Sequence, residues 1–173
     1  MRNLIYILTF CFLIVLSACH DKKPVAQVDT NELKTSLEKA NRYLINDEEE
    51  DINNYISRHN LDMIATGTGL RYQIIKPGSG ELIQPGQTVT MEYVLNDIRG
   101  DVIYTSETEG DKKYVVGHSD VETGLDEVAR YLRLGDVAKV IIPSHLGYGL
   151  LGDQKSIPER ATLIYTIKIK DIQ

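Results

Sequence analysis

The sequence predicts an α+β domain in which an antiparallel sheet of five or six strands wraps around one short helix, preceded by a helical extension. Residues 163–169 alternate between apolar and polar side chains, which is the period of a strand with one buried face. Residues 33–44 instead place apolar side chains at helical spacing. Because the period changes between residues 60 and 70, we assign the extension to residues 29–66 and the sheet domain to residues 67–173.

The first residues resemble a secretory signal that ends at a lipid-attachment site. Arg2 precedes an apolar run over residues 4–16, which is shorter than the roughly 20 residues of a membrane span. The four residues ending at Cys19 resemble the bacterial lipobox; the alternatives are an ordinary cleaved signal and a membrane anchor. We therefore expect a signal peptide over residues 1–18, lipidation of Cys19 and a tether over residues 19–28. This predicts a lipid-anchored protein of the cell envelope, on the periplasmic side of the outer membrane.

Two helices are expected in the extension. The first carries an apolar stripe through Leu33, Leu37 and Leu44, and the second starts near Asn46. The run over residues 47–51 is entirely acidic. It is either a binding patch for basic partners or a set of first-turn acids that complement the helix dipole. The two helices can bury little between themselves, so they either dock on the sheet domain or offer a surface to an envelope protein.

Turn residues divide the sheet domain into its expected elements. Strands are predicted over residues 70–75, 88–95, 102–104 and 114–116, followed by a strand that ends in residues 141–143 and one over 161–169. Apolar residues at helical spacing over 121–132 predict the short helix. Residues 144–160 are too irregular to pair, so this loop should hang over an apolar face and form a pocket. Roughly 105 residues suffice for one core.

Composition argues against several classes of function. The chain has 19 basic and 25 acidic residues, a formal net charge of −6 and no tryptophan, so we expect no nucleic-acid partner. Its four histidines show no paired spacing, which argues against a metal site. No glycine-rich loop of the phosphate-binding kind is found. We therefore expect no metal and no cofactor.

Four sequence blocks follow one another in the sheet domain. They are residues 85–93, 117–125, 134–143, and the run from Pro143 through Tyr148 to Tyr165. Their content and order resemble the FKBP-type peptidyl-prolyl isomerases, over residues 68–173. With the lipobox and the helical extension, the chain most resembles the gliding-motility-associated FKBP-like lipoproteins. The resemblance implies an FKBP-like sheet, and prolyl cis-trans isomerisation of proline-containing polypeptide clients.

The resemblance also implies which residues form the site. Tyr148 falls on the tyrosine whose hydroxyl donates to a substrate carbonyl, and Tyr93 and Tyr165 fall on pocket walls; we expect these three to be catalytic. Val121 and Ile157 fall on apolar wall positions. Strand alternation alone would explain Tyr93 and Tyr165 as core residues. Packing explains Tyr148 poorly, because it stands between two glycines in a loop.

Five positions depart from the family pattern. Leu125 replaces the tryptophan of the pocket floor, Ile103 replaces a wall aromatic, and Tyr104 replaces the neighbouring aspartate. Lys112 replaces another aromatic residue and Glu122 replaces an isoleucine, so both should place polar groups at the pocket rim. The backbone N–H of Glu122 still offers a second hydrogen-bond donor. The pocket should remain apolar but bind proline with less flat surface. We therefore expect weak isomerase activity.

Prolyl isomerisation needs no nucleophile and no metal, because its barrier of about 18–20 kcal/mol comes from amide resonance. An apolar pocket and suitably positioned hydrogen-bond donors can stabilise the twisted amide of the transition state. Three functions remain open: an isomerase assisting the folding of exported or envelope proteins, a non-catalytic proline-binding or chaperone module in a gliding-motility-type envelope machine, and a structural lipoprotein. A cis/trans exchange assay separates the first from the other two.

Overall fold

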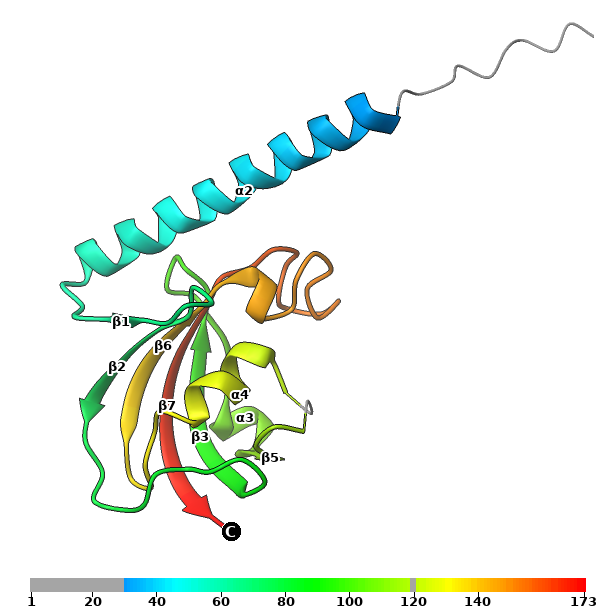
Figure 1. The fold of residues 1–173 in the computed structure, drawn as a ribbon. Helices are drawn as coiled ribbons and strands as arrows, with labels where there is room; N and C mark the ends of the chain where they lie inside the picture. Colours follow the sequence, from blue (N-terminus) through cyan, green and yellow to red (C-terminus); the bar gives the residue numbers. More distant parts are fainter. Residues whose placement is uncertain (1–29, 119–120) are drawn as a thin grey trace, which may run out of the picture. The chain divides into compact units, whose positions relative to one another are not determined.

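The computed structural model describes residues 30–118 and 121–173 (Figure 1). The chain divides into two units, residues 1–41 and residues 42–173. The predictions on the signal peptide, the tether and Cys19 lie outside the described residues. Among the helices that the structure does describe, none combines the length and the hydropathy that a membrane crossing requires.

The second unit is built on one antiparallel sheet that curves around helix α4, Thr123–Ala129 (Figure 1). Within the described residues the sheet has seven strands, in the spatial order β1-β2-β6-β7-β3-β4, with β5 paired to β3. Their bounds are β1 Ile64–Ala65, β2 Arg71–Lys76, β3 Thr88–Asn96, β4 Val102–Thr105, β5 Lys112–Val115, β6 Val137–Ile142 and β7 Leu163–Ile172. The α+β prediction is confirmed. The strand that was not predicted is β1, whose two residues are too few to show a period.

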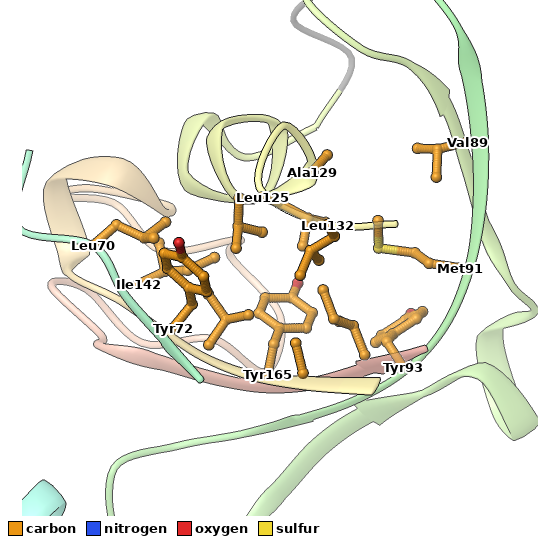
Figure 2. Packing of buried hydrophobic residues seen from close by; sticks show 14 of the residues in the cluster. Leu70, Tyr72, Val89, Met91, Tyr93, Leu125, Ala129, Leu132, Ile142 and Tyr165 are labelled. Carbon is orange, nitrogen blue, oxygen red and sulfur yellow. The ribbon is translucent and has the colours of Figure 1, made fainter. Parts of the chain in front are cut away.

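The core lies between α4 and the sheet face that curves around it (Figure 2). Leu125 and Val128 of α4 are fully buried, and each such side chain contributes about 1.5–3 kcal/mol through removal from water. Gly124 lets the helix come close to the sheet, because a Cβ at this position would lie 2.5 Å from Cγ2 of Ile142. Close packing therefore fixes the start of α4, where the site is built.

Helix α2 is a single helix, Thr30–Arg58. The prediction of a second helix starting near Asn46 is wrong, because no proline or glycine interrupts residues 30–58. The acidic run over residues 47–51 consequently lies in the helix interior. Its explanation as first-turn acids that complement the helix dipole is therefore wrong as well.

The second half of α2 packs on the sheet face opposite the core. Ile52 and Tyr55 are 1% and 5% exposed and cluster with Ile141 of β6 and Ile164 of β7. Ile141 and Ile164 are register partners, so the helix covers one adjacent pair of side chains. Both faces of the sheet are thus covered where β6 ends and β7 begins. The predicted boundary at residue 67 stays a prediction.

Candidate active site

Two tyrosines meet on the core face because of the strand register. Leu95 of β3 pairs with Tyr165 of β7, so Tyr93 lies two residues along on the same face. The rings of Tyr93 and Tyr165 have centroids 5.8 Å apart and planes tilted by 53°. The backbone N–H of Tyr93 donates to the hydroxyl of Ser106 at 2.6 Å, at the start of helix α3, Ser106–Glu109. These contacts hold Tyr93 in one place on the sheet.

The third tyrosine comes from the loop that joins β6 to β7. This loop opens with a 3-10 turn, Ser144–Leu146. The N–H groups of Gly147 and Gly149 both donate to the carbonyl of Ser144, at 3.1 and 2.9 Å, so the residues on either side of Tyr148 are fixed. The half-buried side chain of Tyr148 then donates its hydroxyl to Glu122 at 2.7 Å.

A buried carboxylate connects two of these tyrosines. The side chain of Glu122, which directly precedes α4, is 4% exposed. Its Oε1 accepts the hydroxyls of Tyr148 and Tyr165, both at 2.7 Å, and Nζ of Lys112 lies 3.4 Å away. Its Oε2 has no hydrogen-bond partner among the described residues. The hydroxyl that should serve a substrate is therefore already bonded to Glu122.

Electrostatics fixes the protonation states of this cluster. Burial raises the pKa of Glu122, but the charge of Lys112, the residue's own backbone N–H and the two tyrosine hydroxyls outweigh it and leave the pKa lowered. Glu122 is consequently ionised at neutral pH. Burial and the negative charge of Glu122 raise the pKa values of Tyr148 and Tyr165. Both hydroxyls therefore keep their protons and act as donors.

A hollow of about 470 Å³ opens beside Tyr148. Its lining residues are Tyr93, Tyr104, Glu109, Lys112, Tyr148, Asp153, Lys155 and Ser156. Nζ of Lys112 lies 5.3 Å from the centroid of the Tyr93 ring, within cation–π range. A second hollow of about 480 Å³ lies between α2 and the loops at residues 97–99 and 158–162, and none of the predicted site residues lines it. We therefore place the site at the tyrosine hollow.

Tyr104 brings a carboxylate to the rim of this hollow. Its hydroxyl donates to Oδ2 of Asp153 at 2.5 Å. Oδ1 of Asp153 accepts the backbone N–H groups of Lys155 and Ile157, at 2.9 and 2.8 Å. The bond joins β4 to the Tyr148 loop across the mouth. Although Tyr104 has no carboxylate of its own, it holds one that comes from the opposite loop.

The other predicted positions belong to the same core but differ in exposure. Leu125, Ile157 and Tyr165 are at most 2% exposed and do not line the hollow. Ile103 and Val121 are half-buried and pack against that core. Of the predicted pocket residues, Tyr93, Tyr104 and Tyr148 line the hollow, and Lys112 lines it as expected for a rim position. The structure thus gathers the predicted residues in one core, where Tyr104 and Tyr148 are half-buried and Tyr93 is buried, at 6% exposed.

Two carboxylates of the site were not predicted in their roles. The side chain of Glu122 was expected at the polar rim, and this prediction is wrong, because the side chain is 4% exposed and accepts the hydroxyls of Tyr148 and Tyr165. Nothing in the local pattern shows this inward turn, and the role of the Glu122 backbone N–H as a second donor stays a prediction. Asp153 lies in a loop without periodicity, so only the fold brings it to Tyr104. Within the described ranges, no cluster of histidine, cysteine, aspartate and glutamate could hold a metal ion.

A family model decides the class of protein. The model of the FKBP-type peptidyl-prolyl cis-trans isomerases matches residues 80–170, which is more than half of the chain. The chain belongs to the FKBP family. The matched range contains every predicted pocket residue, from Tyr93 to Tyr165.

Individual FKBP relatives agree with this assignment. FK506-binding protein 1 of Gibberella zeae is 37% identical over 109 residues, which are 60% of this chain and 98% of that protein. The FKBP-type peptidyl-prolyl cis-trans isomerase FkpA of Escherichia coli K12 is 30% identical over 108 residues, which are 62% of this chain but only 39% of that protein. The predicted family and the predicted isomerase are thereby confirmed. The closer relation to gliding-motility lipoproteins stays a prediction.

Solved FKBP structures share the fold. The crystal structure of AtFKBP13 is 22% identical, with a TM-score of 0.61 over 65% of this chain and 100% of that chain. The isomerase of Pseudomonas syringae pv. tomato is 17% identical, with a TM-score of 0.65 over 76% of this chain and 95% of that chain. At these identities the likeness supports the FKBP-like sheet and helix alone.

Proposed function

We propose that this FKBP isomerase binds proline segments of exported or envelope polypeptides in the hollow beside Tyr148 and isomerises them slowly. The observation that carries the proposal is the meeting of Tyr93 and Tyr148 at one hollow, with the hydroxyl of Tyr148 kept protonated. An aromatic face can pack on a proline ring, and a neutral hydroxyl can donate to a peptide carbonyl.

The hydroxyl of Tyr148 must change partners to act. Rotation about a prolyl bond is opposed by about 18–20 kcal/mol, and a donor that holds a flanking carbonyl lowers this barrier only if it binds the twisted amide better. Here Tyr148 first leaves the ionised Glu122. A bond to a charged group is worth about 1.5–3 kcal/mol and a neutral one about 0.5–1.5 kcal/mol, so the exchange costs roughly 1 kcal/mol. This cost supports the proposal of slow turnover.

We further propose that the enzyme is anchored through a lipidated Cys19 in the cell envelope, on the periplasmic side of the outer membrane. The short apolar run and the lipobox-like residues before Cys19 support this. Leu33 and Leu37 of α2 are exposed, at 49% and 59%, and offer an apolar surface to an envelope protein. The Cys19→Ser chain should lose lipid labelling and accumulate as precursor. A wild-type chain without lipid would refute the anchor.

A non-catalytic proline-binding module, as in a gliding-motility-type machine, is the second candidate. The bond between Tyr148 and Glu122 favours it, because a donor that never leaves the carboxylate cannot assist rotation. The two candidates differ in one experiment, cis/trans exchange of a proline peptide without protease. Exchange faster than that of the free peptide supports the isomerase. Saturable binding with unchanged exchange supports the module.

A further inference from the structure

One member of the acidic run on α2 contacts the loop that carries Tyr148. Glu48 accepts three hydrogen bonds from that loop. The backbone N–H of Ser144 donates to Oε1 at 2.6 Å, and the hydroxyl of Ser144 donates to Oε2 at 2.9 Å. The hydroxyl of Thr162 donates to Oε1 at 2.7 Å. A single carboxylate therefore binds two residues that are far apart in the loop.

These two residues are the ends of the loop. Ser144 follows β6 after Pro143, and Thr162 directly precedes β7, so residues 143–162 leave and rejoin the sheet at Glu48. Ser144 and Thr162 are 8% and 6% exposed, and Glu48 is half-buried. Glu48 thus binds both ends of the loop.

Further hydrogen bonds of the loop connect Glu48 to the backbone beside Tyr148. The N–H of Gly149, which follows Tyr148, donates to the carbonyl of Ser144 at 2.9 Å. The carbonyl of Gly149 accepts the N–H of Arg160 at 2.8 Å, and the guanidinium of Arg160 donates to the carbonyl of Leu44 at 3.1 Å. Helix α2 therefore reaches the backbone next to Tyr148 by two routes.

We infer that Glu48 is a positioning residue of the isomerase, because it fixes both ends of residues 143–162 and thereby the place where the Tyr148 hydroxyl meets a substrate. The inference rests on the proposed role of Tyr148. It makes the second half of α2 part of the enzyme rather than a spacer. Misplacing a group by about 1 Å can cost about 100-fold in rate, so Glu48 should matter beyond its effect on stability.

The test compares Glu48→Ala, Glu48→Gln and Glu49→Ala in the full chain, purified in detergent. Glu49 is the matched control, because it pairs with the largely buried Arg71 of β2 and anchors the same helix without a bond to the loop. Glu48→Ala should lower kcat/KM by about ten- to hundredfold, with most of the loss in kcat. Glu49→Ala should lower it by about twofold or less, because Glu49 has no bond to the loop that carries Tyr148.

Glu48→Gln should recover kcat/KM to within about threefold of wild type, because the amide oxygen can accept the Ser144 N–H and the Thr162 hydroxyl while the amide nitrogen donates to Ser144 Oγ. Hydrogen exchange at the Gly149 amide should be faster in Glu48→Ala than in Glu49→Ala. Should Glu48→Ala fail to fold, Thr162→Val removes one of the three bonds and should cost about threefold.

Equal activity losses in Glu48→Ala and Glu49→Ala, or no recovery in Glu48→Gln, would refute the role of Glu48. Unchanged activity in Thr162→Val would count against it in the same way. A wild-type chain that leaves peptide exchange at the uncatalysed rate would instead refute the proposed function, and the positioning role with it. The two failures are distinguishable, because only the second appears before any residue is changed.

Discussion

Replacing Glu122 with glutamine tests whether the buried carboxylate restrains the Tyr148 hydroxyl. The amide oxygen can still accept the hydroxyls of Tyr148 and Tyr165, so the fold should survive with a loss of about 1 kcal/mol in the free energy of unfolding. The bond that Tyr148 must break becomes a neutral one. The exchange cost of about 1 kcal/mol then disappears, which corresponds to about a fivefold rise in kcat/KM.

The assay is cis/trans exchange of a proline peptide, with Tyr148→Phe and the double variant completing a cycle. If the gain arises from the freed hydroxyl, Glu122→Gln should give no gain in the Tyr148→Phe background. A fall in kcat/KM for Glu122→Gln would show that the carboxylate itself assists rotation. A gain that persists without the Tyr148 hydroxyl would equally refute our explanation.

Three further predictions concern the charge of Glu122, the packing of Ile52 and the hydroxyl of Tyr104. The pKa of Glu122 is lowered in the fold, so its stabilising contribution should be complete above about pH 4.5 and be lost as the pH falls through the folded-state pKa. The free energy of unfolding in urea should therefore differ less between about pH 6 and about pH 3 in Glu122→Gln than in wild type. Ile52→Ala should lower the free energy of unfolding by about 2–4 kcal/mol, because it opens a cavity against Ile141 and Ile164. A loss of less than about 0.5 kcal/mol, measured by calorimetry, would mean that α2 does not dock on the sheet in solution. Tyr104→Asp should slow exchange more than Tyr104→Phe, because both variants remove the hydroxyl donor of Asp153 but only aspartate adds a like charge beside it. A Tyr104→Asp enzyme faster than Tyr104→Phe would contradict this.

The sequence predicted those parts of the molecule that depend on local periodicity. The alternation in β3 and β7 placed Tyr93 and Tyr165 on the core face, and the glycines around Tyr148 identified it as a loop residue. Its role beyond packing stays a prediction. The inward turn of Glu122 could not be predicted, since it depends on hydroxyls that the fold brings to it. The contact of Glu48 with Ser144 joins residues 96 positions apart, which no local pattern reports.

Helix α2 shows a second limit of periodicity. The acidic run suggested a helix start, although the chain contained nothing that would end the preceding helix. Ile164 lies on the same side of β7 as Thr162 and Thr166, and strict alternation does not show what covers that side. The packing of Ile52 and Tyr55 on Ile141 and Ile164 gives that side its apolar partner.

The most direct test of the central claim is cis/trans exchange of a proline peptide at saturating enzyme, measured for wild type and Tyr148→Phe. We predict exchange faster than in the free peptide for wild type. Loss of one neutral hydrogen bond, worth about 0.5–1.5 kcal/mol, should slow Tyr148→Phe by about two- to tenfold relative to wild type, with little change in affinity. Saturated binding by wild type with exchange at the uncatalysed rate would contradict the claim that the Tyr148 hollow catalyses rotation.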